Sequence, residues 1–141
     1  MLHLAVVVSL FAVGCRGKSD VRTPTVPDSA QKRASVTGRV TYLQRIALPP
    51  GSVINVKLVD VSRQDAPAIT IGEQKIVTTS EQVPVSFEIK YNPTEIKPDH
   101  TYAIQASITI DGRLRWVTAT IHQVITQGHP NTVEIVLQSA T

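Results

Sequence analysis

Apolar and polar residues alternate with a period of two in four segments after residue 34, and this pattern constrains the fold more than any other feature. The clearest segment is 83–91, where apolar residues at 83, 85, 87, 89 and 91 are separated by proline or polar residues. Successive side chains of a β-strand point to opposite faces, so the alternation predicts strands with one buried face. The pattern recurs at residues 36–42, 102–110 and 133–137.

Three further segments predict strands less clearly. Residues 53–61 alternate weakly, residues 68–79 are interrupted by Gly72, and residues 113–125 are apolar on both faces in their middle. The last segment is expected to be a central strand or one that contains a bulge. Asp111-Gly112 lies between two strand segments and predicts a type I′ hairpin, because both central residues of that turn need positive φ.

Seven strands at roughly regular spacing in about 105 residues predict an all-β fold, a two-sheet antiparallel β-sandwich with Greek-key connections of the immunoglobulin or transthyretin kind. A small closed barrel is the alternative. Tyr102 begins a strand after the loop 96–101 and has the spacing of a tyrosine corner, although it could equally fill the core. Pro84 cannot donate a ladder hydrogen bond, so its strand, or the one broken by Gly72, is the expected sheet edge.

The formal net charge of +3 lies outside this predicted domain. Residues 16–34 carry five Lys or Arg against two Asp, whereas nine basic and nine acidic residues follow from Ser35 onward. A nucleic-acid-binding face needs clustered positive charge on the domain itself. The charge distribution therefore argues against a nucleic-acid partner.

The only cysteine, Cys15, follows an apolar run of twelve residues, 2–13. At 1.5 Å per residue a helix of this length is too short for a bilayer core of roughly 30 Å, but it has the length of the apolar h-region of a secretory signal peptide. Residues 12–15 read Ala-Val-Gly-Cys and resemble a lipobox, although Ala12 replaces the usual Leu and no basic residue precedes the run. An ordinary secretory peptide that leaves a free thiol, or a buried N-terminal strand, is the alternative.

These features divide the chain into three parts. Residues 1–14 are expected to be a lipoprotein signal peptide, and residues 15–34 the lipid-anchor cysteine with a flexible tether. Residues 35–141 are expected to form the β-domain. The segment 16–33 combines charge, Ser, Thr and proline without hydrophobic periodicity, and fully extended it could reach about 60 Å.

Residues that could carry chemistry are few, and no catalytic residue, cofactor, metal or small-molecule substrate is predicted. Asp99-His100 could contribute to a metal site, but no second histidine stands at ligand spacing, so a solvated loop pair is the preferred interpretation. The stretch 60–67, Asp-Val-Ser-Arg-Gln-Asp-Ala-Pro, is the most distinctive local sequence. A loop held by Asx-turns explains it better than a ligand site.

Residues 35–139 resemble the YbaY family of bacterial lipoproteins, which is related to the YscW-type pilotins of type III secretion. The resemblance implies a lipid-anchored β-sandwich with Cys15 as the anchor position, and it leaves the activity open. It depends on motifs distributed over the whole domain: Gly38, Tyr42, Leu48-Pro49, Leu58-Val59-Asp60-Val61, Asp65-Ala66-Pro67, Phe87, Tyr91, Tyr102 and Gly112.

The leading hypothesis is a non-enzymatic lipoprotein of the bacterial cell envelope, bound to the outer membrane through acylated Cys15 and facing the periplasm. Its domain would bind a secretin-like envelope protein, as a pilotin or assembly chaperone, through a strand edge or an apolar cleft. The alternative is a carbohydrate- or cell-wall-binding module. That alternative needs exposed aromatic side chains, for which Trp116, Tyr42, Tyr91 and Tyr102 are the candidates.

Overall fold

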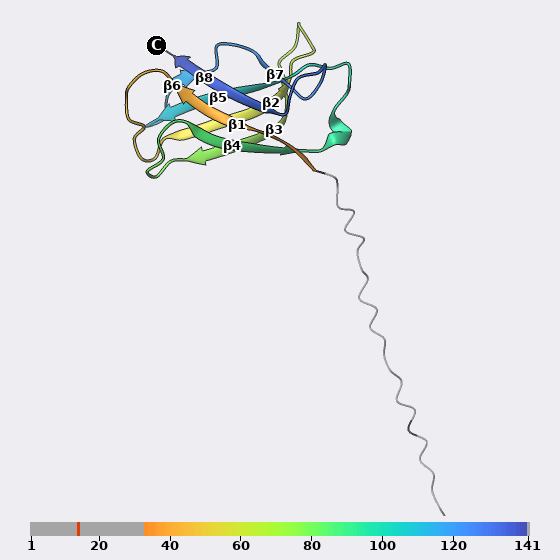
Figure 1. Cartoon of the computed structure of the whole chain (residues 1–141), viewed down its shortest axis with the longest axis horizontal. Helices are drawn as coiled ribbons and strands as arrows, with labels where there is room; N and C mark the ends of the chain where they lie inside the picture. Colours follow the sequence, from red (N-terminus) through yellow and green to blue (C-terminus); the bar gives the residue numbers. More distant parts are fainter. Residues whose placement is uncertain (1–13, 15–32, 141) are drawn as a thin grey trace, which may run out of the picture.

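The computed structural model describes residue 14 and residues 33–140. Residues 34–139 form one β-barrel domain (Figure 1). Eight strands and one short 3-10 helix follow each other along the chain: β1 (Ala34–Tyr42), β2 (Val53–Asp60), β3 (Ile69–Val77), β4 (Val85–Tyr91), η1 (Pro93–Glu95), β5 (Tyr102–Ile110), β6 (Arg113–Val117), β7 (His122–Val124) and β8 (Thr132–Ser139). The predicted all-β class is confirmed. No helix in the described part of the chain has the length and apolar character needed to cross a bilayer.

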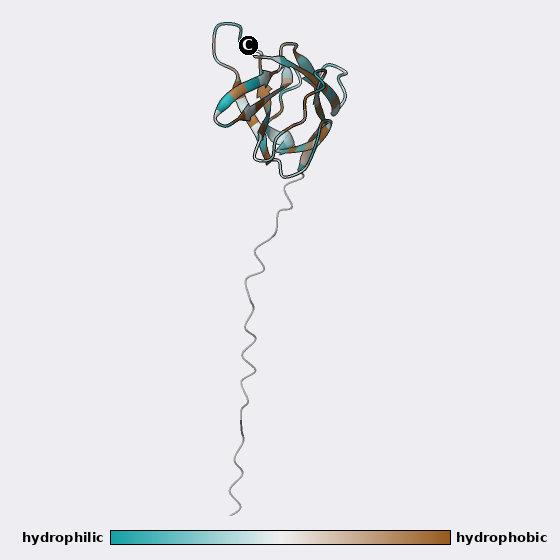
Figure 2. Cartoon of the chain, turned by 90° about the vertical axis from the view of Figure 1, so that its left-hand side faces the viewer, coloured by the Kyte–Doolittle hydropathy of each residue, from teal (hydrophilic) through white to brown (hydrophobic). Residues whose placement is uncertain are grey.

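The strands form one continuous sheet in the order β3-β2-β5-β6-β8-β1-β4, with β7 paired separately to β5. Figure 2 shows them arranged around a common interior. The two-sheet sandwich predicted from the sequence is therefore replaced by a nearly closed barrel, with eight strands in place of seven. Pairing is also not wholly antiparallel, because β1 and β8 run parallel from Thr37↔Thr132 to Tyr42↔Leu137.

The predicted strand 113–125 is divided in the structure. Residues 118–121 separate β6 from β7, and both strands pair with β5. A bulge in β6 leaves Arg115 opposite no residue, since Ile108 pairs with Trp116 and Thr109 with Leu114. Only β6, which lies between β5 and β8, is therefore central and bulged as expected, whereas β7 pairs with β5 alone.

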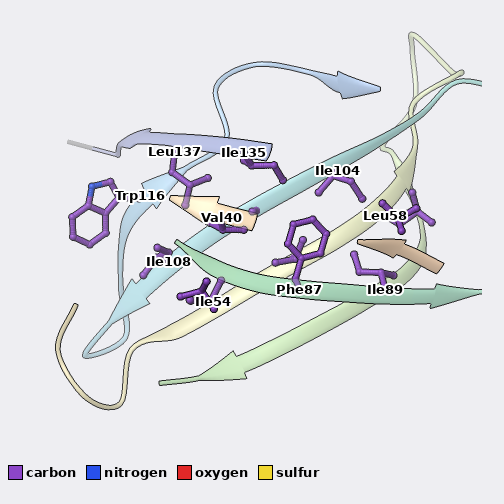
Figure 3. Packing of buried hydrophobic residues seen from close by; sticks show 14 of the residues in the cluster. Val40, Ile54, Leu58, Phe87, Ile89, Ile104, Ile108, Trp116, Ile135 and Leu137 are labelled. Carbon is purple, nitrogen blue, oxygen red and sulfur yellow. The ribbon is translucent and has the colours of Figure 1, made fainter. Parts of the chain in front are cut away.

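Aliphatic side chains from facing strands fill the interior (Figure 3). In β4 every second residue is buried, and the buried positions are Val85, Phe87, Ile89 and Tyr91, as predicted from the alternation. Five aliphatic residues at the centre are completely buried: Ile54, Leu58, Ile104, Ile108 and Ile135. Burial of this apolar surface is the main source of the barrel's stability.

Two predicted local structures are confirmed. Asp111 and Gly112 have φ of 50° and 75°, as a type I′ turn requires. The hydroxyl of Tyr102 accepts a hydrogen bond from the Lys97 N–H at 2.9 Å and donates one to the Glu95 carbonyl at 3.4 Å. This phenol therefore forms a tyrosine corner while its ring, 1% exposed, also lies in the core.

Two strands form the ends of the sheet: β3, which contains Gly72, and β4, which begins directly after Pro84. These are the two strands that the sequence predicted as candidates for a sheet edge. They lie side by side (Figure 1) without a backbone ladder between them. The Gln74 Oε1 accepts the Glu88 N–H at 2.7 Å across this seam. A Cβ at Gly72 would lie 2.8 Å from Ile89 Cγ2, so glycine permits the close approach that nearly closes the barrel.

Candidate functional site

The two loop motifs that the sequence singled out, Asp60–Pro67 and Asp99-His100, meet at one end of the barrel. His100 Nδ1 lies 2.6 Å from Asp60 Oδ2, so His100 pairs with Asp60 and not with its neighbour Asp99. The other Asp60 oxygen accepts the Ser62 N–H at 2.9 Å and the Ser62 hydroxyl at 2.6 Å. The predicted Asx-turn is confirmed.

This Asp60–Ser62–His100 cluster joins three loops. The Thr101 N–H donates to Ser62 Oγ at 2.8 Å, and the Thr126 hydroxyl donates to the His100 carbonyl at 2.7 Å. Burial raises the pKa of the Asp60 carboxyl, but the hydrogen bonds from Ser62 and His100 outweigh it and hold the pKa below its ordinary value. Asp60 is therefore a carboxylate at neutral pH.

The cluster has the residue types of a hydrolase triad but not its geometry. In a triad the serine hydroxyl donates to the histidine, whereas the Ser62 hydroxyl donates to the Asp60 carboxylate and accepts from a backbone N–H. Among the described residues, no three His, Cys, Asp or Glu side chains form a group that could hold a metal ion. The cluster therefore holds together the loops that contain Ser62, His100 and Thr126.

The aromatic side chains do not form the exposed stacking platform that a carbohydrate-binding module needs. Tyr42 and Trp116 lie side by side, with ring centroids 4.3 Å apart and an interplanar angle of 9°, but each is only 4% exposed. Tyr91 and Tyr102 are buried as well. The alternative predicted from the sequence therefore loses its supporting feature.

The Tyr42–Trp116 stack instead supports a cleft at the other end of the barrel. The Tyr42 hydroxyl donates to the Ile46 carbonyl at 2.6 Å, and the Trp116 Nε1–H donates to Gln44 Oε1 at 3.1 Å. The Gln82 side chain forms a further pair of hydrogen bonds with the Leu48 backbone. These contacts hold the loop 43–52 over the end of β6.

The cleft at this end of the barrel, here named the arginine cleft, lies between the loop 43–52 and the β5–β6 hairpin. Its volume is about 540 Å³, compared with about 260, 280 and 380 Å³ for three other surface clefts. One wall is apolar, and the other carries both charged and aromatic groups. The lining residues are Ile46, Ala47, Pro49, Ile110, Asp111, Arg113, Arg115 and Trp116.

Sequence reasoning missed the two arginines of this cleft. The signal available was Arg113-Leu114-Arg115, which directly follows the Asp111-Gly112 turn, together with the proline-rich loop at residues 47–51. Nothing in the pattern shows that these two segments, more than sixty residues apart, lie at one end of the barrel.

A second exposed apolar group lies around the cleft of about 280 Å³. Leu43 and Val136 line it and are 80% and 41% exposed. His122 also lines it, its Nε2 is buried without a hydrogen-bond partner, and burial lowers its pKa. This histidine is therefore neutral at neutral pH.

Cys15, the predicted lipidation site, lies outside the described residues, as do most of the predicted signal peptide and tether. The barrel begins at Ala34, which pairs with Tyr91 at the same end as the Asp60–Ser62–His100 cluster. The arginine cleft lies at the opposite end, where β1 finishes at Tyr42. The segment that joins Cys15 to the barrel therefore enters at the end remote from the cleft.

The fold defines the class of small, single-domain β-barrel proteins with an aliphatic core. A family model described as type III secretion system lipoprotein chaperone (YscW) matches residues 31–137, and the chain belongs to this family. The resemblance predicted from the sequence is thereby confirmed.

Two relatives extend this result. The chain is 34% identical over 140 residues to the uncharacterized lipoprotein YbaY of Escherichia coli strain K12, covering 91% of this chain and 74% of that protein. It is also similar to the structure of an alternative pilotin from the type II secretion system of Vibrio cholerae. The match has 41% identity and a TM-score of 0.76, and covers 78% of this chain and 99% of that chain.

Proposed function

We propose that this protein is a non-enzymatic, lipid-anchored chaperone of the pilotin type, which binds a secretin-like protein of the bacterial cell envelope. The observation that carries the proposal is the similarity to the Vibrio cholerae pilotin, at 41% identity over 99% of that chain. The description of the family as secretion-system lipoprotein chaperones supports the same role.

In this proposal residues 1–14 are the signal peptide, Cys15 is acylated, and the segment up to residue 34 connects the lipid to the barrel. Two or three acyl chains make membrane attachment long-lived, at about 0.8 kcal/mol per buried CH₂. Arg16, in place of Asp, follows the cysteine and favours the outer membrane, with the barrel in the periplasm. The similarity to the lipoprotein YbaY supports the anchor.

A barrel of this kind binds a partner through its surface, by accepting an extended or helical peptide. The seam between β3 and β4 and the cleft supported by Trp116 are the surfaces available for this role. The lipid anchor then holds the bound partner at the membrane in which it assembles.

The test is co-purification of the full-length protein, expressed in its own cells, from detergent-solubilised envelope. We expect a secretin-like protein to co-purify, and intact mass to place an acylated N-terminus at Cys15. The Cys15→Ser variant is the control, which is expected to leave the membrane fraction yet still bind the partner in detergent. Recovery of no envelope protein above background would contradict the proposal.

A further inference from the structure

The arginine cleft brings two arginines together with a single acidic residue. Over the described residues the single ion pair joins Asp60 and His100, so no carboxylate partners Arg113 or Arg115. Both arginines are exposed, and the only acidic side chain lining the cleft is Asp111. From Ser35 onward, basic and acidic residues are equal in number. The cleft is therefore a local positive site on a neutral domain.

The same cleft offers apolar contact area. Ile46 in its wall is 58% exposed, and Ile110, at the end of β5, lies in the same lining. Ala47 and Pro49 continue the wall along the loop 43–52. A ligand that fits both the charge and the apolar surface must itself be amphipathic.

The cleft is held in shape before any ligand arrives. Tyr42, Gln44 and Trp116 fix the loop from below, and the Ser52 and Thr78 hydroxyls both donate to the Pro49 carbonyl, at 2.6 and 3.1 Å. Binding to a preformed site avoids most of the entropy cost of ordering a loop. A volume of about 540 Å³ accommodates a few side chains of a peptide.

The position of the cleft favours a protein over a lipid surface. The connection to Cys15 enters the barrel at Ala34, at the opposite end from Arg113 and Arg115. A domain tethered at that end is free to turn its other end away from the membrane and toward a protein partner. The carboxylates that meet these arginines are therefore expected on a partner protein.

We infer that the arginine cleft binds a short, acidic, amphipathic segment of the partner, with carboxylates on Arg113 and Arg115 and apolar side chains against Ile46 and Pro49. The inference rests on the proposed function and specifies the chemistry of the partner's segment. Arginine is suited to this task because its planar guanidinium pairs with carboxylates through two hydrogen bonds.

The first experiment locates the segment in cells. A photo-crosslinking p-benzoylphenylalanine replaces Ile46 in the full-length protein, and a parallel variant carries it at Val136, in the other apolar cleft. The peptide cross-linked at position 46 is expected to carry net negative charge and apolar residues. A basic or uncharged peptide, or lipid, at this position would overturn the inference.

The second experiment tests the charge pairing with a synthetic peptide of that cross-linked sequence. The Arg113→Glu/Arg115→Glu protein is expected to bind it about tenfold or more weakly in low salt, because like charges then face each other. The control, Arg63→Glu/Lys97→Glu, makes the same charge change in loops outside the cleft and is expected to bind like the parent. A peptide with Lys in place of its acidic residues should restore binding to the cleft variant.

Equal binding by both charge-reversed proteins would overturn the inference. A partner cross-linked at Val136 but not at Ile46 would also overturn it, while leaving the proposed function intact. Absence of protein cross-links at both positions would overturn the inference as well, whereas the proposed function is decided separately by co-purification of an envelope protein. Near-ultraviolet circular dichroism of Trp116 verifies that each variant is folded.

Discussion

At the scale of single residues, the Asp60 side chain connects the turn at Ser62 with His100, forty residues further along the chain. Its side chain is 11% exposed and receives three hydrogen bonds, from the Ser62 backbone, the Ser62 hydroxyl and His100. A partly buried carboxylate with hydrogen-bonded oxygens stabilises the structure most while it stays ionised. The cluster is therefore a structural feature whose strength depends on pH.

We predict that Asp60→Asn destabilises the fold by about 1–3 kcal/mol at pH 7, the typical effect of losing hydrogen bonds to a charged group. The folded-state pKa of Asp60 lies below its unfolded value of about 3.9. Its contribution is therefore complete above roughly pH 5 and is lost as the pH falls through the folded-state pKa. Urea unfolding between pH 2.5 and 7 measures this.

The difference in stability between the parent protein and Asp60→Asn is expected to shrink toward acidic pH. The exposed Asp99→Asn, next to His100 but outside the cluster, is the matched control and should leave the profile unchanged. A constant difference across this pH range would show that the charge of Asp60 does not stabilise the loops.

At the scale of strands, two glycines set how closely neighbouring strands approach. A Cβ at Gly38 in β1 would overlap the Val133 carbonyl of β8 and lie 2.8 Å from the Phe87 ring. The contact with Val133 involves backbone in the parallel pair, which cannot move without shifting the ladder. At Gly72 the nearest atom is a side-chain methyl of Ile89, at 2.8 Å.

We therefore predict that Gly38→Ala costs more stability than Gly72→Ala, about 3 kcal/mol or more against about 1–2 kcal/mol. Thermal unfolding of the two variants and of the parent protein measures the order. A larger residue at position 38 would also disturb the pairing of β1 with β8, the first and last strands of the barrel. Equal losses would mean that the β1–β8 ladder adjusts as easily as the Ile89 side chain.

The strand scale also shows what the sequence can and cannot predict. Alternation identified the buried faces of β1, β4, β5 and β8 correctly, because the period of two is a local property of extended backbone. It could not show that β1 and β8 pair in parallel, or that residues 118–121 interrupt a strand. Those features depend on contacts between segments distant in sequence, and the sandwich prediction failed for this reason.

The candidate sites show the same division. Asp60 and His100 were each noticed for their local sequence, but their pairing spans forty residues and appears only in the fold. The arginines at 113 and 115 were overlooked, since their significance depends on the loop 43–52 lying beside them. Local chemistry is readable from the sequence, whereas the assembly of a site is not.

At the scale of the whole molecule, the barrel is a sheet whose two ends meet without a ladder. The Glu88 N–H of β4 points toward β3 and donates to the Gln74 side chain. Backbone groups alternate in direction along a strand, so the N–H groups of Ser86 and Lys90 face the same seam, while those of Phe87 and Ile89 face β1. The seam is thus closed by side chains.

We predict that amide hydrogen exchange along β4 alternates, with Phe87 and Ile89 protected most, Ser86 and Lys90 exchanging fastest, and Glu88 between them. The Gln74→Ala variant should raise the exchange rate of the Glu88 amide by about tenfold or more. It removes the only acceptor of that N–H in the described structure, so the amide can exchange without a local opening of the seam. Exchange at Phe87 should stay unchanged, because its partner strand β1 is not altered. Uniform protection of all five amides would mean that β3 and β4 form a complete ladder in solution, and that no strand edge is open to a partner at this seam.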